Sequence, residues 1–159
     1  MILFFQATPA QTAPAPAVPA APVRAQYGWG YSGPDGEGTG TLSLLMDAAT
    51  GKLVLELHGL GERLVLLEGD QASGYHVLAP RQKLDQRAAT LADLPLPFLP
   101  QVPSVEALLK LLRTGEGPGV TVTKKDATGP LKLHWQGQDP KGLTEQVWLD
   151  RKRWEDVGR

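Results

Sequence analysis

The sequence predicts a mainly β fold of the α+β class, a curved open antiparallel sheet or half-barrel. A helix and a leucine- and proline-rich segment are expected to cover its concave face. Apolar and polar residues alternate with period 2 along most of the chain, which is typical of strands with one buried face. Only one stretch has the period of a helix, whereas a parallel sheet needs a helix after nearly every strand.

The first half of the folded region predicts a meander of short strands. In the stretch KLVLELH, residues 52–58, Leu53, Leu55 and Leu57 fall on one face and Val54 falls on the other. Glycine-containing turns flank this strand. Further strands are expected at 27–31, 41–47, 63–67 and 75–79.

One helix is predicted between two groups of strands. Ser104 follows Pro103 and is a suitable N-cap, and Gly115 is a suitable C-terminal stop. The residues between them form one apolar stripe with the spacing i, i+3, i+4 and i+7, made by Val105, Leu108, Leu109 and Leu112. A second meander is expected to follow, with strands at 119–124, 131–136 and 143–150.

The chain divides into a tether and one domain. Residues 1–25 are mostly alanine and proline and carry one charge, Arg24. Such a composition buries little apolar surface and favours extended conformations, so we expect a disordered N-terminal tether. Residues 26–156 are expected to form a single β domain. An apolar N-terminus followed by an alanine–proline tether is a common layout of cell-envelope proteins, which favours that location.

Composition excludes several classes of function. The 159-residue chain has a net charge of −1 and a pI of about 6.3, which argues against nucleic-acid binding. No apolar run reaches the roughly 18 residues that span a bilayer. There is no cysteine, so disulfides and thiol chemistry are excluded. Nothing in the sequence calls for a cofactor.

No motif predicts an enzyme or a metal site. Residues 28–33 read GxGxxG, but the loop 34–38 follows where a dinucleotide-binding fingerprint needs a helix. Glu56 and His58 share a strand face, yet spacing places no third ligand beside them, so a solvated face is expected. No serine lies in a GxSxG motif. The basic residues 151–153 are expected to be a solvated terminus.

The stretch 91–112, LADLPLPFLPQVPSVEALLKLL, contains eight leucines and four prolines. Either it fills the core, or it and the helix cover an apolar concavity that holds a ligand. In the second case the candidate wall consists of strand leucines, namely Leu53, Leu55, Leu57, Leu64 and Leu66. The candidate cover consists of Leu96, Phe98, Leu99, Val105, Leu108, Leu109 and Leu112.

Three stretches resemble the LolA/LolB-like superfamily of bacterial periplasmic lipoprotein-carrier proteins. They are the hairpin 38–57 (GTGTLSLLMDAATGKLVLEL), the strand 69–83 (GDQASGYHVLAPRQK) and the closing strand 143–150 (LTEQVWLD). The resemblance implies a LolA-like half-barrel that binds lipid acyl chains or a lipidated protein in the periplasm. A monomer is expected, with an envelope membrane protein as a possible further partner.

The sequence departs from that family in three respects. An alanine–proline tether replaces the usual first amphipathic helix. The arginine with which family carriers latch the cover has no clear counterpart, although Arg81 and Arg87 are candidates. Without a lipoprotein cysteine, a membrane-anchored receptor of the LolB type is not expected.

Three functions follow from these observations. The first is a non-enzymatic carrier that holds acyl chains under the cover. The second is a protein-interaction or sensing module with a filled core, which would use exposed aromatic residues among Trp29, Tyr31, Trp148 and Trp154. The third is a hydrolase, which needs a cleft that joins a histidine with a serine and an acid. The histidines available are His58, His76 and His134.

Overall fold

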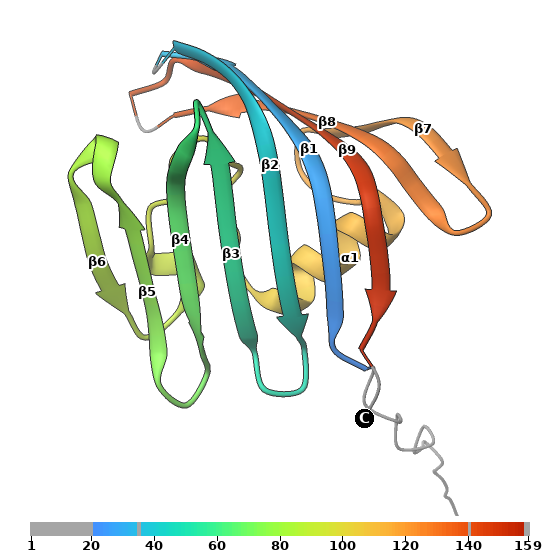
Figure 1. Cartoon of the computed structure of the whole chain (residues 1–159), viewed down its shortest axis with the longest axis horizontal. Helices are drawn as coiled ribbons and strands as arrows, with labels where there is room; N and C mark the ends of the chain where they lie inside the picture. The colour runs from blue at the N-terminus through green and yellow to red at the C-terminus, as the bar shows by residue number, and fades with distance from the viewer. Residues whose placement is uncertain (1–20, 35, 140, 158–159) are drawn as a thin grey trace, which may run out of the picture.

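The computed structural model describes residues 21–34, 36–139 and 141–157 (Figure 1). Within this part of the chain, nine strands form one antiparallel sheet and one α-helix packs on it. The strands are β1 (Val23–Gly33), β2 (Gly36–Asp47), β3 (Lys52–Gly59), β4 (Glu62–Asp70), β5 (Gly74–Ala79), β6 (Leu84–Ala88), β7 (Val120–Asp126), β8 (Gly129–Gln138) and β9 (Thr144–Asp156). The helix is α1 (Val105–Thr114), and two 3-10 turns, η3 (Pro80–Gln82) and η4 (Leu91–Asp93), flank β6.

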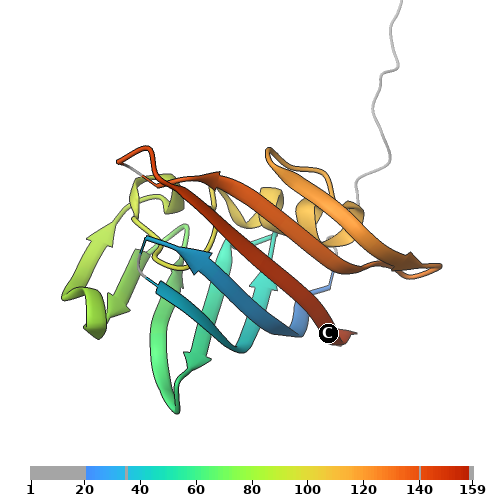
Figure 2. The same cartoon turned by 90° about the horizontal axis from the view of Figure 1, so that it is seen from above.

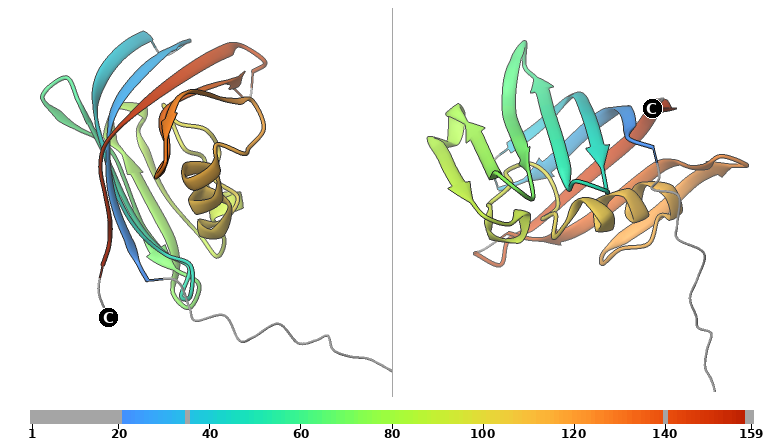
Figure 3. Two further views of the ribbon diagram at one scale, coloured as in Figure 1. Left: turned by 90° about the vertical axis from the view of Figure 1, so that its right-hand side faces the viewer. Right: turned by 90° about the horizontal axis from the view of Figure 1, so that it is seen from below.

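The sheet is open and curved, which confirms the predicted fold class. Its strand order is β6-β5-β4-β3-β2-β1-β9-β8-β7, so β6 and β7 are the two edges and the sheet does not close. Strands β7, β8 and β9 arch over α1, while β1 to β6 form the wall behind it (Figure 2). The side view in Figure 3 shows α1 inside the curve of the sheet.

The first and last strands hold the two meanders together. Strand β1 pairs with β2 on one side and with β9 on the other, over nearly its whole length. The pairing runs from Val23 opposite Asp156 to Ser32 opposite Gln146, with a bulge between Gln26 and Tyr27. Bulges increase local twist, which fits the bend between the wall and the arch.

Alternation along each strand puts apolar side chains on the concave face. Cross-strand partners there include Leu44 with Leu55 and Met46 with Leu53, and all four side chains are buried. The inner residues of β1, β4 and β5 extend the same layer. The core therefore lies between the concave face and the segments that cover it.

The helix forms as predicted. The Ser104 side chain accepts a hydrogen bond from the Ala107 amide, which caps the first turn. Gly115 follows the last turn in the left-handed conformation, with φ of 78°, and its amide donates to the carbonyl of Leu111. Both signals act locally, which is why the sequence placed them correctly.

The structure corrects two predicted boundaries and adds one strand. The domain begins before residue 26, because β1 starts at Val23 and buries both Val23 and Ala25. Residues 1–20 of the predicted tether lie outside the described residues, and residues 21 and 22 directly precede β1. Strand β6 was not predicted, since its sequence LDQRA is short and polar. The basic residues 151–153 belong to β9, which continues to Asp156.

Leu66 does not belong to the concave wall. A bulge between Leu57 and His58 shifts the pairing, so that Leu57 faces Val65 and the concave positions of β4 become Val65 and Leu67. Leu66 pairs with Glu56 and is half-buried on the convex face. Period-2 reasoning fails at such a point, because one extra residue reverses the two faces of a strand.

Two buried tyrosines on the concave face differ in their hydroxyl contacts. Within the described residues, the Tyr27 hydroxyl is buried and has no hydrogen-bond partner. Burial raises the pKa of Tyr27 well above its ordinary value, and nearby Arg151 opposes this shift. The Tyr75 hydroxyl, by contrast, donates to the carbonyl oxygen of Gly51.

We expect Tyr27→Phe to leave the free energy of unfolding unchanged or to raise it, because it removes a polar group that lacks a partner. The matched change Tyr75→Phe should lower it by about 1–3 kcal/mol, since the Gly51 carbonyl loses its donor. Urea unfolding followed by circular dichroism measures both. Equal losses for the two variants would contradict the difference in hydroxyl contacts.

Candidate functional site

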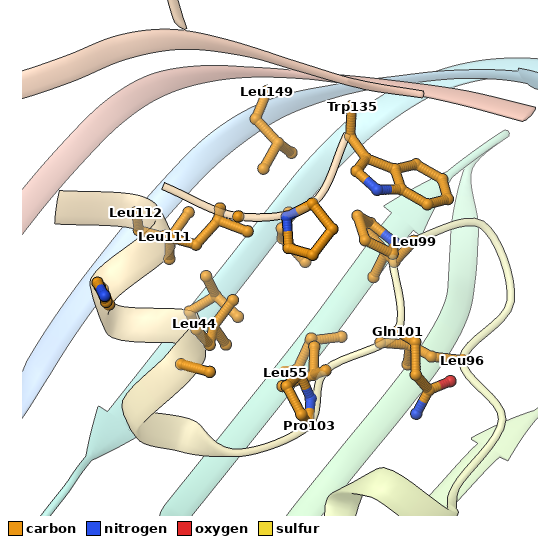
Figure 4. A pocket seen from close by; sticks show the side chains of 18 of the residues that line it. Leu44, Leu55, Leu96, Leu99, Gln101, Pro103, Leu111, Leu112, Trp135 and Leu149 are labelled. Atoms are coloured by element: carbon orange, nitrogen blue, oxygen red, sulfur yellow. The ribbon is translucent and has the colours of Figure 1, made fainter. Parts of the chain in front are cut away.

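An apolar cavity of about 570 Å³ lies between α1, the leucine–proline segment (residues 91–103) and the concave face of the sheet (Figure 4). We refer to it as the apolar cavity. Its walls come from four directions, with β2 and β3 behind and β8 and β9 above. Strand and loop residues in the lining include Leu42, Leu44, Leu55, Leu96, Leu99, Trp135 and Leu149, and α1 contributes Ala107, Leu108, Leu111 and Leu112.

The helix divides its apolar residues between the core and the apolar cavity. Val105 and Leu109 are buried and pack into the core without lining the cavity. Leu108 and Leu111 are only half-buried and line the cavity, and the buried Leu112 lines it too. The apolar stripe is therefore wider than the core needs, and its outer margin faces the cavity.

The predicted wall is only partly in place. Leu55 lines the apolar cavity, whereas Leu53, Leu57 and Leu64 are buried elsewhere in the core. Leu66, on the convex face, does not contribute. The sequence reasoning missed Leu42 and Leu44 on β2, which lie opposite Leu57 and Leu55. The hairpin pairing of 41–47 with 52–58 would have identified them.

Only part of the predicted cover lines the apolar cavity. Leu96, Leu99, Leu108 and Leu112 line the apolar cavity, and Phe98 lines a different one described below. Trp135 and Leu149 were not predicted, because only the arch of β8 and β9 over α1 brings them to the site.

Phe98 fixes the middle of the leucine–proline segment. Its backbone is left-handed, with φ of 67°, an uncommon conformation for a bulky residue. Its ring meets Trp29 and Tyr31 edge-on, at centroid distances of 6.2 and 5.3 Å. The Trp29 indole N–H donates to the Phe98 carbonyl oxygen over 3.1 Å. These contacts offset the backbone strain and hold the segment against β1.

Gln101 fixes the segment at a second point. Its side-chain nitrogen donates to the carbonyl oxygens of Leu91 and Leu94, at 3.2 and 2.6 Å. Prolines at 95, 97, 100 and 103 restrict the backbone between these anchors. The segment is thus held as a defined wall although it forms neither helix nor strand over most of its length.

A second cavity of about 800 Å³ adjoins the first, and we refer to it as the mixed cavity. It lies on the other side of the leucine–proline segment, where the turns after β1, β5 and β8 approach one another. Its apolar lining includes Leu84, Phe98 and Leu143. Its polar lining consists of Gln82, Gln101, Gln138, Asp139, Lys141 and Glu145.

Charged groups are scarce in the apolar cavity. The charged residues in its lining are Lys110 and Glu116, whose side chains pair at 3.3 Å and are about two-thirds exposed. They therefore mark its rim and not its interior. A lining of this kind favours apolar ligand groups, since a polar group placed inside would lose its water without gaining a partner.

The histidines lie away from both cavities. His58 lies 3.7 Å from Glu56, and His76 lies 2.6 Å from Asp85. His134 contacts the Gln146 amide at 2.8 Å. All three lie on the convex face. The neighbours of His58 and of His76 along their strands are buried, and His134 is paired with the exposed Trp148.

The two candidate latch arginines do not reach the leucine–proline segment. Arg81 lies in η3 and forms an exposed ion pair with Glu62 at 2.6 Å. This hydrogen-bonded pair lowers the pKa of the Glu62 carboxyl. Arg87 is exposed on the edge strand β6. The anchoring roles fall instead to Trp29, through Phe98, and to Gln101.

Most aromatic residues expected on the surface are covered. Trp29 and Tyr31 are buried, which corrects the idea that they form an exposed anchor. Trp154 is half-buried, with the guanidinium groups of Arg113 and Arg151 over its ring. Trp148 alone among the four is well exposed, at 43%, and it stacks on the His134 ring on the convex face.

Comparison with known proteins assigns no family. No protein-family model matches the chain, and no curated protein has a similar sequence. None of the helices in the described ranges is long and apolar enough to cross a membrane.

We expect Phe98→Ala to lower the free energy of unfolding by about 3–5 kcal/mol, because it removes a buried ring from the contact with Trp29 and Tyr31. Leu60→Ala is the matched control. Leu60 also has a left-handed backbone, with φ of 54°, but its side chain is 63% exposed. That change should stay within about 0.5 kcal/mol. Chemical denaturation compares the two, and similar small losses would show that Phe98 is not an anchor.

Proposed function

We propose that this protein is a non-enzymatic module of the cell envelope that binds the acyl chains of a lipid or of a lipidated protein in the apolar cavity. The observation that carries the proposal is the cavity itself, about 570 Å³ walled mainly by leucines. This volume lies in the range of about 300–1,000 Å³ that small-molecule sites occupy.

The energetics of the lining favour a hydrocarbon ligand. Each methylene group moved from water into such a cavity contributes about 0.8 kcal/mol. The sheet side is formed by buried leucines of β2 and β3, which offer no hydrogen-bonding side chain. Specificity for a polar molecule would need such groups, so an acyl chain is the ligand that fits.

The half-buried leucines mark a solvent-accessible opening of the apolar cavity. Leu96, Leu108 and Leu111 line the apolar cavity and remain partly accessible to solvent. Partly exposed apolar side chains around a cavity are typical of binding sites, because a bound ligand completes their burial. The exposed ion pair of Lys110 and Glu116 lies at the rim of the same cavity.

The resemblance to the LolA/LolB-like superfamily supports the remaining parts of the proposal. An open antiparallel half-barrel with a helix in its concavity is the architecture that the resemblance implied, and this chain has it. A periplasmic location, a monomeric state and an envelope membrane protein as partner belong to the proposal by that analogy.

A second candidate function rests on the convex face. Trp148 is exposed and stacks on His134, and exposed tryptophans often anchor protein interfaces. An interaction or sensing module would use this surface and would need no ligand in the apolar cavity. The two functions differ in one observable, which is whether an acyl chain binds.

We expect the full chain, expressed in a bacterial envelope compartment and purified gently, to carry lipid that native mass spectrometry and organic extraction detect. Leu108→Arg should abolish this binding, because it places a charge beside the apolar cavity. Ala107→Trp should also weaken it, because a larger side chain fills the space. An added fatty-acid probe should raise the Tm of the unmodified protein and not that of these variants.

Leu66→Arg is the matched control, since Leu66 is half-buried but lies on the convex face. It should leave lipid binding unchanged. A protein that is free of lipid and that takes up no acyl probe would contradict the proposal. That result would direct attention to Trp148 and a protein partner.

A further inference from the structure

The two cavities meet at one boundary. Leu96, Leu99, Gln101 and Trp135 line both of them. The apolar cavity lies on one side of these four residues, with charged groups only at its rim. The mixed cavity lies on the other side and carries three glutamines together with Asp139, Lys141 and Glu145. A ligand longer than the apolar cavity would therefore pass from an apolar to a polar environment at this boundary.

The boundary presents one hydrogen-bond donor and one acceptor. The Gln101 nitrogen donates to two backbone carbonyls, so the oxygen of this exposed side chain remains available as an acceptor. The Trp135 indole N–H likewise donates to no group in the described part of the chain. Both side chains lie at the edge of the apolar cavity (Figure 4).

Trp135 is held in place by its neighbours. A side chain at Gly137 would come within 2.2 Å of the Trp135 ring, so the ring occupies space that only glycine leaves free. A side chain at Gly119 would approach the indole nitrogen to 3.3 Å. This close packing holds the indole ring, and with it the N–H, in a preorganised position.

The charges of the mixed cavity disfavour an anionic group. Asp139 and Glu145 supply two carboxylates against the single ammonium of Lys141. The Asp139 carboxylate already accepts from the amides of Lys141 and Leu143, and Glu145 accepts from the Tyr31 hydroxyl at 2.9 Å. The side chains best suited to a ligand are the three glutamines, whose amides can both donate and accept.

We propose that the two cavities form one site for an amphiphile, with the acyl chain in the apolar cavity and an uncharged head group, rich in hydroxyls or amides, in the mixed cavity. A hydroxyl or an amide both donates and accepts, so a head group with several of them can accept from the Trp135 indole N–H and donate to a glutamine oxygen of the mixed cavity. A phosphate or sulfate only accepts, and a quaternary ammonium does neither. This inference rests on the proposed acyl-chain binding.

Three amphiphiles with the same dodecyl chain test the head-group preference. Isothermal titration calorimetry of the full chain would use dodecyl maltoside, dodecyl sulfate and dodecyltrimethylammonium, each below its micelle concentration. Dodecyl maltoside should bind about tenfold more tightly than the other two, the factor expected from one or two net hydrogen bonds.

Trp135→Phe removes the indole N–H and keeps an aromatic ring. It should weaken dodecyl maltoside about three- to tenfold and leave dodecyl sulfate unchanged. Trp148→Phe, at the exposed tryptophan of the convex face, is the matched control and should change neither affinity. If Trp135→Phe does not fold, Gln138→Leu at the mixed cavity should give the same selective loss.

Each other result overturns the inference in a distinct way. Equal affinities for the three amphiphiles, or tighter binding of a charged one, would leave acyl-chain binding intact and remove the head-group preference. An equal loss of all three in Trp135→Phe would show that the indole acts only through packing. Failure of all three to bind would overturn the proposed function as well.

Discussion

In the described part of the chain, a single short helix has to cover the concave face of a nine-stranded open sheet, and the rest of the structure follows from this constraint. The ten residues of α1 can bury only part of the apolar layer formed by β1 to β5. The leucine–proline segment and the arch of β7 to β9 cover more of it. The space that none of them fills is the apolar cavity, walled by leucines that would otherwise be core.

The covering segment achieves rigidity without regular secondary structure. A proline-rich chain cannot supply the backbone hydrogen bonds of a helix or strand, so side chains provide its attachments. The aromatic contact of Phe98 with Trp29 and Tyr31 fixes one point, and the Gln101 amide fixes another. A wall that is fixed at two points can keep a cavity open, whereas a loose apolar segment would collapse into it.

Polar and apolar groups are unevenly distributed over the two faces of the sheet. The histidines and most ion pairs lie on the convex face or at its edges, where water screens them. Gln101 and Trp135 are the two residues with polar side-chain groups that line both cavities. An apolar cavity that adjoins a polar one is the arrangement that the proposed binding of an amphiphile requires.

The sequence by itself determined the local features of this protein. Alternation predicted most of the strands, and Ser104 and Gly115 predicted the ends of the helix, because these signals depend on neighbouring residues only. Only the tertiary structure decided which apolar residues face the apolar cavity. A one-residue bulge moved Leu66 to the convex face, the rotation of α1 separated Leu108 from Leu109, and the arch brought Trp135 and Leu149 to the site. Register, rotation and curvature arise from contacts between residues distant in sequence, so no local pattern could have shown them.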